Sequence, residues 1–157
     1  MVYDPALTKP DVLAKRIAAV GFKVERVAPT PTRRTTTKPE RVKARLPDDA
    51  PEFFRTAFEQ ARRKQRPMVI DFHATWCVPC KRLKKETLGA PTVAKLLEQV
   101  ELIYVDVDRN PDLAKAFDVR SVPDVLFINR GGYIIDRLGN FEPPAAFRDR
   151  LRRLLAD

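Results

Sequence analysis

Apolar positions after residue 50 follow first the period of an amphipathic helix and then the pattern of a buried strand. A set at helical spacing predicts a helix that ends near Lys64. The set consists of Phe53, Phe54, Ala57, Phe58 and Ala61. Met68–His73 is an almost unbroken apolar run, which predicts a central buried strand. Residues 78–98 have a helical pattern that we expect to be interrupted near Pro91, because proline lacks an amide donor.

The remainder of the chain continues this alternation of strands and helices. We expect a second core strand, a short helix, a hairpin of two strands and a closing helix. Their ranges are Leu102–Val107, Pro111–Phe117, Val125–Ile128 with Tyr133–Leu138, and 143–156. The order predicts an α/β fold in which a mixed central sheet has helices on both faces.

The first fifty residues have a different character. Residues 1–27 predict a small βαβ segment of strand, helix and strand, and residues 28–50 form a basic stretch rich in proline and threonine. Such a composition provides no apolar face, so we expect a linker. The sequence therefore divides into residues 1–27, a linker at 28–50 and a main domain at 51–157.

The positive charge is concentrated in the middle of the chain. The net charge is +9, and residues 28–66 hold eleven Lys and Arg against five Asp and Glu. A solvated, self-repelling linker explains this excess, and binding to nucleic acid or an anionic membrane is the alternative. Because no aromatic residue lies among the basic residues of 33–41 to stack on bases, we expect no nucleic-acid partner.

Two features bear on location. No apolar run approaches the length of about 18 residues that a membrane helix needs, so we expect no stable membrane association. Five charged residues within the first sixteen interrupt any apolar core of a signal peptide. We therefore expect a cytoplasmic protein.

The two cysteines, Cys77 and Cys80, lie in the segment Trp-Cys-Val-Pro-Cys-Lys, between a predicted buried strand and a predicted helix. At a helix N-terminus, free backbone amides and the helix dipole favour thiolate over thiol. Pro79 suits the first helical turn, where its missing N–H has no partner. We expect Cys77 to be the attacking nucleophile and Cys80 to resolve the mixed disulfide.

The residues alone leave several alternative roles open for the cysteine pair. Half of a zinc site is one, although His73 is the sole further soft ligand in its neighbourhood and structural zinc normally takes four. A thiol pair that binds or delivers a soft metal such as Cu(I) is the main alternative function. Two further alternatives are that the cysteines are inert core residues, or that the domain is a scaffold that serves only for contacts. We expect no cofactor and no metal.

The residues around the pair strongly resemble the active site of thioredoxins. The resemblance rests on Val69–Lys81, followed in the family's order by Val105–Pro111 and Val119–Asp124, and it covers about residues 52–157. Lys85–Val93 is more similar to the C-terminal thioredoxin-like domain of DsbD and its soluble relatives. This resemblance implies a thioredoxin fold and a thiol-disulfide oxidoreductase that transfers electrons between disulfide-containing protein substrates and a redox partner protein.

The resemblance also implies roles for single residues. Asp71 aligns with the family's buried carboxylate, which takes the proton of the resolving thiol; a strand-end aspartate bonded to backbone is the alternative. Pro123 aligns with the family's cis-proline beside the substrate. Trp76 would cover the site; an aromatic that serves only for packing is the alternative. The implied substrate-binding residues are Trp76, Val78, Pro79, Val122 and Pro123.

Some positions depart from the family's pattern. Val78 stands where glycine is frequent, His73 where an aromatic residue is frequent, and Tyr104 where classical thioredoxins have a lysine near the buried carboxylate. These differences leave the direction of electron flow open. Residues 1–27 resemble the second half of a heavy-metal-associated domain, but the half that carries the metal-binding cysteines has no counterpart.

Overall fold

The computed structural model describes residues 42–157, which form one five-stranded sheet with helices on both sides. The strands are β1 (Val42–Lys43), β2 (Met68–His73), β3 (Glu101–Asp106), β4 (Asp124–Ile128) and β5 (Tyr133–Leu138). Their order across the sheet is β1-β5-β4-β2-β3. Among these described strands, only β2 and β3 pair in parallel, so the mixed sheet expected from the sequence is confirmed.

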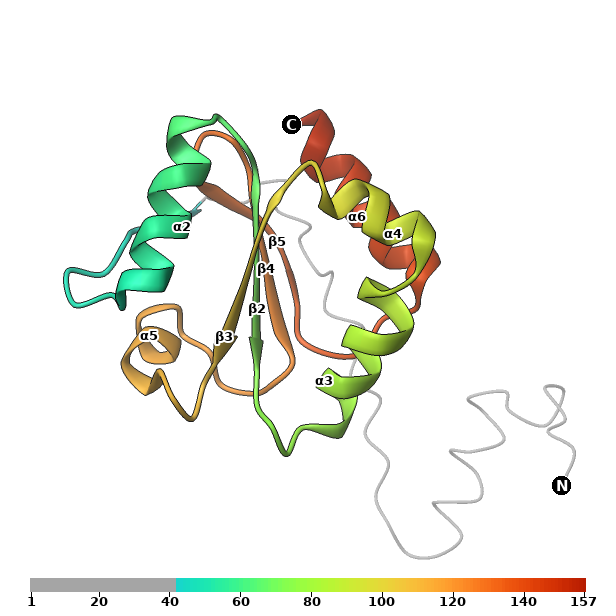
Figure 1. The fold of residues 1–157 in the computed structure, drawn as a ribbon, viewed down its shortest axis with the longest axis horizontal. Helices are drawn as coiled ribbons and strands as arrows, with labels where there is room; N and C mark the ends of the chain where they lie inside the picture. The colour runs from blue at the N-terminus through green and yellow to red at the C-terminus, as the bar shows by residue number, and fades with distance from the viewer. Residues whose placement is uncertain (1–41) are drawn as a thin grey trace, which may run out of the picture. The chain divides into compact units, whose positions relative to one another are not determined.

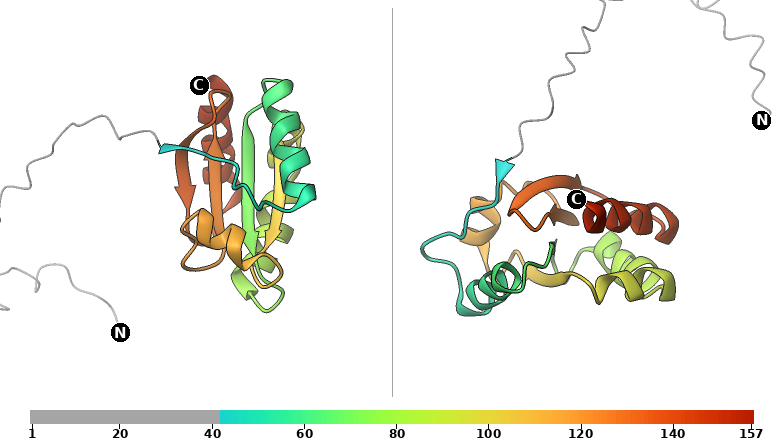
Figure 2. Two further views of the ribbon diagram at one scale, coloured as in Figure 1. Left: turned by 90° about the vertical axis from the view of Figure 1, so that its left-hand side faces the viewer. Right: turned by 90° about the horizontal axis from the view of Figure 1, so that it is seen from above.

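Helices cover the two faces of this sheet separately, as Figure 1 shows with the sheet seen on edge. The helical segments are α2 (Glu52–Arg63), α3 (Val78–Arg82), the π-helical η2 (Leu83–Leu88), α4 (Pro91–Leu97), α5 (Pro111–Ala116) and α6 (Pro144–Ala156). α2 and α5 lie on one face, whereas α3, η2, α4 and α6 lie on the other (Figure 2). Two separate apolar cores result, one between each helical layer and the sheet.

β2 is the centre of the sheet because its sequence is apolar on both faces. It pairs with β3 from Met68 to His73 and with β4 from Met68 to Phe72. Ile70 and Phe72 enter the core beneath α2, and Val69 enters the opposite core beneath η2 and α6. A strand that is paired and covered on all sides needs a continuous apolar run, as its sequence has.

The helical stretch after the cysteines contains an irregularity that the sequence pattern did not predict. η2 has the wider π-helical turn, in which the amide of Gly89 bonds to the carbonyl of Lys84. A Cβ at Gly89 would lie 2.8 Å from the Lys85 carbonyl oxygen, so glycine permits this close approach. The expected interruption is confirmed, since Pro91 starts α4 as a new helix.

The second core strand expected at Leu102–Val107 is β3, which places Ile103 and Val105 in the core but lies at the sheet edge and leaves Tyr104 partly exposed. One expectation about the edge of the domain needs correction. Residues 42–50, expected to end the linker, pack on the domain. Val42 and Lys43 pair with β5, and the small side chains of Ala44 and Ala50 are buried in the core. Pairing satisfies backbone groups of β5 that would otherwise be free.

Residues 1–27 and the first part of the expected linker lie outside the described residues. Within residues 42–157, no helix is long and apolar enough to cross a membrane. The cytoplasmic location stays a prediction.

The core beneath α2 offers a test of these packing relations. Phe54 is fully buried, and its ring centroid lies 5.7 Å from that of Phe117, which in turn lies 5.7 Å from that of Phe72. We expect Phe54→Ala to lower the free energy of unfolding by about 3–5 kcal/mol, because truncation leaves a cavity. Phe53→Ala, at the exposed neighbouring position, is the matched control and should change it by less than about 0.5 kcal/mol. Equal losses in chemical denaturation would contradict this packing.

Candidate active site

Three strand ends converge at one end of the sheet and create the site. β2 and β3 run in parallel and end together at His73 and Asp106. β4 runs antiparallel to β2, so it starts there, with Asp124 opposite Phe72. The segments that follow β2 and β3 and the segment that precedes β4 are therefore neighbours, although they are far apart in sequence.

The cysteine pair lies at this convergence, at the start of α3. Cys77 and Cys80 form a disulfide, and Cys77 is the N-cap residue of α3. The backbone amide of Cys80 donates a hydrogen bond to Cys77 Sγ at 3.2 Å. A donor directed at this sulfur also stabilises it as a thiolate after reduction. Pro79 stands in the first turn of the helix, as expected.

The disulfide is recessed between apolar neighbours. Cys77 is 2% exposed, and Val107 and Val122 pack against the pair together with the buried Ala74. Val122 belongs to the loop before β4, and its peptide bond to Pro123 is cis. The structure thus brings the predicted residues Cys77, Cys80, Val122 and Pro123 together.

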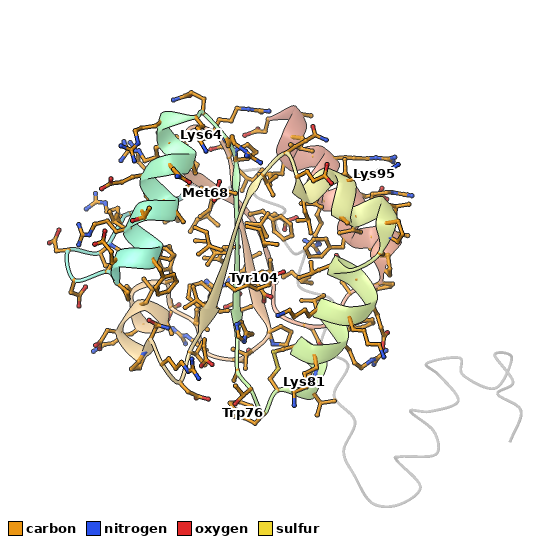
Figure 3. The ribbon with its side chains drawn as sticks, viewed as in Figure 1. Lys64, Met68, Trp76, Lys81, Lys95 and Tyr104 are labelled. Carbon is orange, nitrogen blue, oxygen red and sulfur yellow. A yellow bond between two sulfur atoms is a disulfide. The ribbon has the colours of Figure 1, made fainter. Side chains whose placement is uncertain are left out.

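Two apolar side chains project beside the recessed disulfide. Trp76 is 64% exposed and Val78 is 65% exposed. The indole Nε1 of Trp76 donates a hydrogen bond to Asp108 Oδ2 at 2.9 Å, which ties the ring to the turn after β3. Figure 3 shows Trp76 and Lys81 at the end of the molecule opposite Lys64 and Lys95. Trp76 is therefore exposed and held by Asp108, and its role in covering the site stays a prediction.

Asp71 lies in the middle of β2 and is buried. Its Oδ1 has no hydrogen-bond partner within the described residues. It is on the same face of β2 as Val69, which packs in the core shared with Leu83 of η2. Burial raises the pKa of this carboxyl from 3.8 to about 6, against the opposing effect of the Lys84 ammonium. Asp71 is therefore no strand-end aspartate satisfied by backbone.

Lys84 and Tyr104 form the surroundings of this carboxyl. Tyr104 is opposite Asp71 in the β2–β3 register, and the Lys84 Nζ lies 5.0 Å from the centroid of its ring. Burial, and then the Asp71 charge, raise the pKa of Tyr104. Burial lowers the pKa of His73, whose ring is 6.2 Å from that of Tyr104. The cation near the buried acid thus comes from η2, while β3 contributes a phenol.

Sequence reasoning did not identify two of these partners. Asp108, the acceptor for Trp76, follows β3 in a turn whose geometry the pattern did not reveal. In the sequence, Lys84 is one of several basic residues that follow Cys80, and nothing but its charge distinguishes it. Its position four residues after Cys80 places both on one face of a helix, and this signal could have linked it to the buried acid.

The arrangement supplies thiols and a carboxyl, and nothing in it resembles a metal centre. Within residues 42–157, no group of three or more His, Cys, Asp and Glu is placed to hold a metal ion. A thiol pair and a nearby carboxyl can carry out thiol-disulfide exchange with a proton acceptor.

Comparison with known proteins agrees with this chemistry. Residues 50–152 match the family model described as Thioredoxin. The chain is 34% identical over 100 residues to the thiol:disulfide interchange protein DsbD of Vibrio vulnificus, which covers 60% of this chain and 17% of DsbD. It is 32% identical over 133 residues to the mitochondrial thioredoxin of Mus musculus, which covers 82% of this chain and 74% of that protein.

A solved structure shows the same fold. The oxidised C-terminal domain of DsbD from Neisseria meningitidis superposes with a TM-score of 0.59 at 24% identity, over 65% of this chain and 93% of that domain. The matched region contains the cysteine pair and all three strand ends that form the site. Through residues 50–152, the chain belongs to the thioredoxin family of thiol-disulfide oxidoreductases.

Proposed function

We propose that this domain reduces disulfide bonds in partner proteins through the Cys77–Cys80 pair. The observation that carries the proposal is the disulfide itself, which starts a helix, contacts Val122 beside the cis peptide bond, and has a buried, unsatisfied carboxyl on the sheet beneath its helix. In this proposal, the oxidised Cys77–Cys80 pair is the form that the domain reaches after it has reduced one substrate disulfide.

In the first step, the Cys77 thiolate attacks one sulfur of a substrate disulfide. A mixed disulfide forms, and the other substrate sulfur leaves as a thiolate. The helix N-terminus and the Cys80 amide favour the Cys77 thiolate. Cys77 is the nucleophile because it precedes the helix, whereas Cys80 lies within its first turn.

In the second step, Cys80 loses its proton and attacks the Cys77 sulfur. The intramolecular disulfide re-forms, and the substrate leaves as a dithiol. Asp71, with a pKa of about 6, is ionised at neutral pH and accepts the Cys80 proton. A partner protein or a small dithiol then supplies two electrons and two protons to restore the thiols.

The substrate would dock on the apolar rim of the disulfide. Trp76 and Val78 present exposed surface on one side, and the partly buried Val122, followed by the buried Pro123, lies on the other. An extended substrate segment can pair with free backbone near Pro123 while its disulfide approaches Cys77. The low exposure of the pair favours a substrate that fits this rim.

The buried carboxyl supports reduction as the direction of transfer. A negative charge beneath the pair makes the thiolate form less favourable. A pair whose reduced form is less stabilised gives up its electrons more readily, whereas strong oxidants stabilise the reduced form. Relatives named thioredoxin are consistent with this direction.

Removal of each cysteine should separate the two steps. Cys77→Ser should abolish insulin reduction with dithiothreitol as the electron donor, because the nucleophile is lost. Cys80→Ser should retain attack but accumulate a mixed disulfide with the substrate, visible by non-reducing electrophoresis. The proposal would be contradicted if Cys77→Ser reduced insulin at the same rate as the unchanged protein.

Asp71→Asn should change stability and its pH dependence together. A carboxyl whose pKa rises on folding stabilises the fold fully below about pH 3.8, and this contribution is lost as the pH passes about 6. A shift from 3.8 to about 6 corresponds to about 3 kcal/mol. Urea unfolding at pH 7.5 should show Asp71→Asn more stable by up to that amount, with little difference at pH 4, and resolution of mixed disulfides should slow. Equal stability at both pH values would contradict the assignment.

Lys84→Met should raise the pKa of Asp71, because the opposing cation is removed. The pH at which mixed-disulfide resolution reaches half its maximal rate should move upward. Lys85→Met, on the same helical segment, is the control and should leave this pH unchanged. An identical shift in both variants would show that general surface charge is responsible.

A further inference from the structure

A guanidinium holds the loop that carries the cis-proline. Arg137 lies on β5 opposite Leu126 of β4, and its Nε donates to Asp124 Oδ1 at 2.8 Å and to Oδ2 at 3.1 Å. The Nη2 of Arg137 also contacts Asp124 Oδ2. Asp124 directly follows Pro123 and is buried. Fork-like pairing of this kind fixes both direction and distance between two side chains.

The same guanidinium reaches the other end of the loop. Arg137 Nη2 donates to the carbonyl oxygens of Asp118 at 2.9 Å and of Phe117 at 3.3 Å. These residues follow α5, where the chain turns through Asp118 with a φ of 51°. A non-glycine residue in this left-handed region is held there by its surroundings. One side chain therefore connects the start and the end of the segment 118–124.

Between these two anchors, Val119 and Val122 pack against the core beneath α2, but the backbone of the loop has few hydrogen bonds. Within residues 42–157, none of the backbone–backbone hydrogen bonds outside helices and strands involves residues 120–122. Arg120 pairs with the nearby side chain of Asp118, which is itself exposed. Apart from the packing of Val122, the position of the backbone at Val122 and Pro123 thus depends on the anchors that Arg137 holds.

We infer that Arg137 is a positioning residue for the substrate edge, acting through Asp124 and the Asp118 carbonyl on the Val122–Pro123 segment. Arg137 itself, on β5, does not touch the cysteines. Its contribution is to keep the backbone beside Pro123 in place for an extended protein substrate, which a small disulfide does not need. This inference rests on the proposed function and adds a determinant of affinity for protein substrates.

The test uses the full chain, reduced beforehand and mixed rapidly with oxidised insulin or with the small aromatic disulfide DTNB. Trp76 is the sole tryptophan of the chain, so its fluorescence can report oxidation of the neighbouring pair. Dependence of the rate on insulin concentration separates the half-saturating concentration from the limiting rate. Thermal unfolding of each variant measures stability independently.

Arg137→Met should raise the half-saturating insulin concentration about tenfold, equivalent to about 1.4 kcal/mol of binding free energy. The limiting rate and the DTNB rate should remain within about twofold, because the cysteine environment is unchanged. Arg137→Lys keeps the charge but loses the fork, so it should fold and give an intermediate rise of about threefold.

Arg150→Met is the matched control. Arg150 is also a partly buried arginine that pairs with two carboxylates, Asp136 and Glu142, but it lies on α6, on the other face of the sheet. The inference would be overturned if the half-saturating insulin concentration were unchanged in both Arg137 variants. It would also be overturned if this concentration rose equally in Arg150→Met. Failure of the unchanged protein to react with either disulfide would instead reject the proposed function.

Discussion

Pairing of β2 on both of its edges is the constraint on which the rest of the structure depends. A slip of one residue against β3 or β4 would turn Asp71 from the cysteine-bearing face to the face beneath α2. Such a slip would also move Ile70 and Phe72 from the core beneath α2 to the core on the opposite face of the sheet. The register therefore determines both the hydrophobic layers and the side chain beneath the helix of the disulfide. The ends of the three strands then assemble the site.

The site conflicts with the stability of the core that supports it. A carboxyl oxygen without a partner among residues 42–157, inside an apolar strand, is unfavourable, and its raised pKa is what the proposed proton transfer near neutral pH requires. Lys84 offsets part of this cost without an ion pair that would hold the acid permanently ionised. The second buried carboxylate, Asp124, differs from Asp71 because it is paired with the guanidinium of Arg137.

Sequence periodicity predicted most of the fold because burial is encoded locally. The run Met68–His73 and the helix around Phe54 and Phe58 emerge in the structure with the expected bounds. The pattern could not show that β3 lies at an edge, since sheet order is a non-local property. It also missed the pairing of Val42 with β5, because two residues in a basic, proline-rich stretch provide no periodic signal. Cys77 and Cys80 were identifiable from local chemistry and Asp71 from the resemblance to thioredoxins, whereas the contacts of Lys84 and Arg137 depend on tertiary geometry.

The reduction potential of the Cys77–Cys80 pair tests the central claim most directly. The full chain can be equilibrated with dithiol and disulfide buffers of defined ratio, and the fraction of oxidised protein measured by alkylation and mass spectrometry. A reductant of protein disulfides should show a two-electron midpoint near about −270 mV, as thioredoxin does. A midpoint near about −120 mV, typical of a strong oxidant, or a pair that does not equilibrate with the buffer at all, would contradict it.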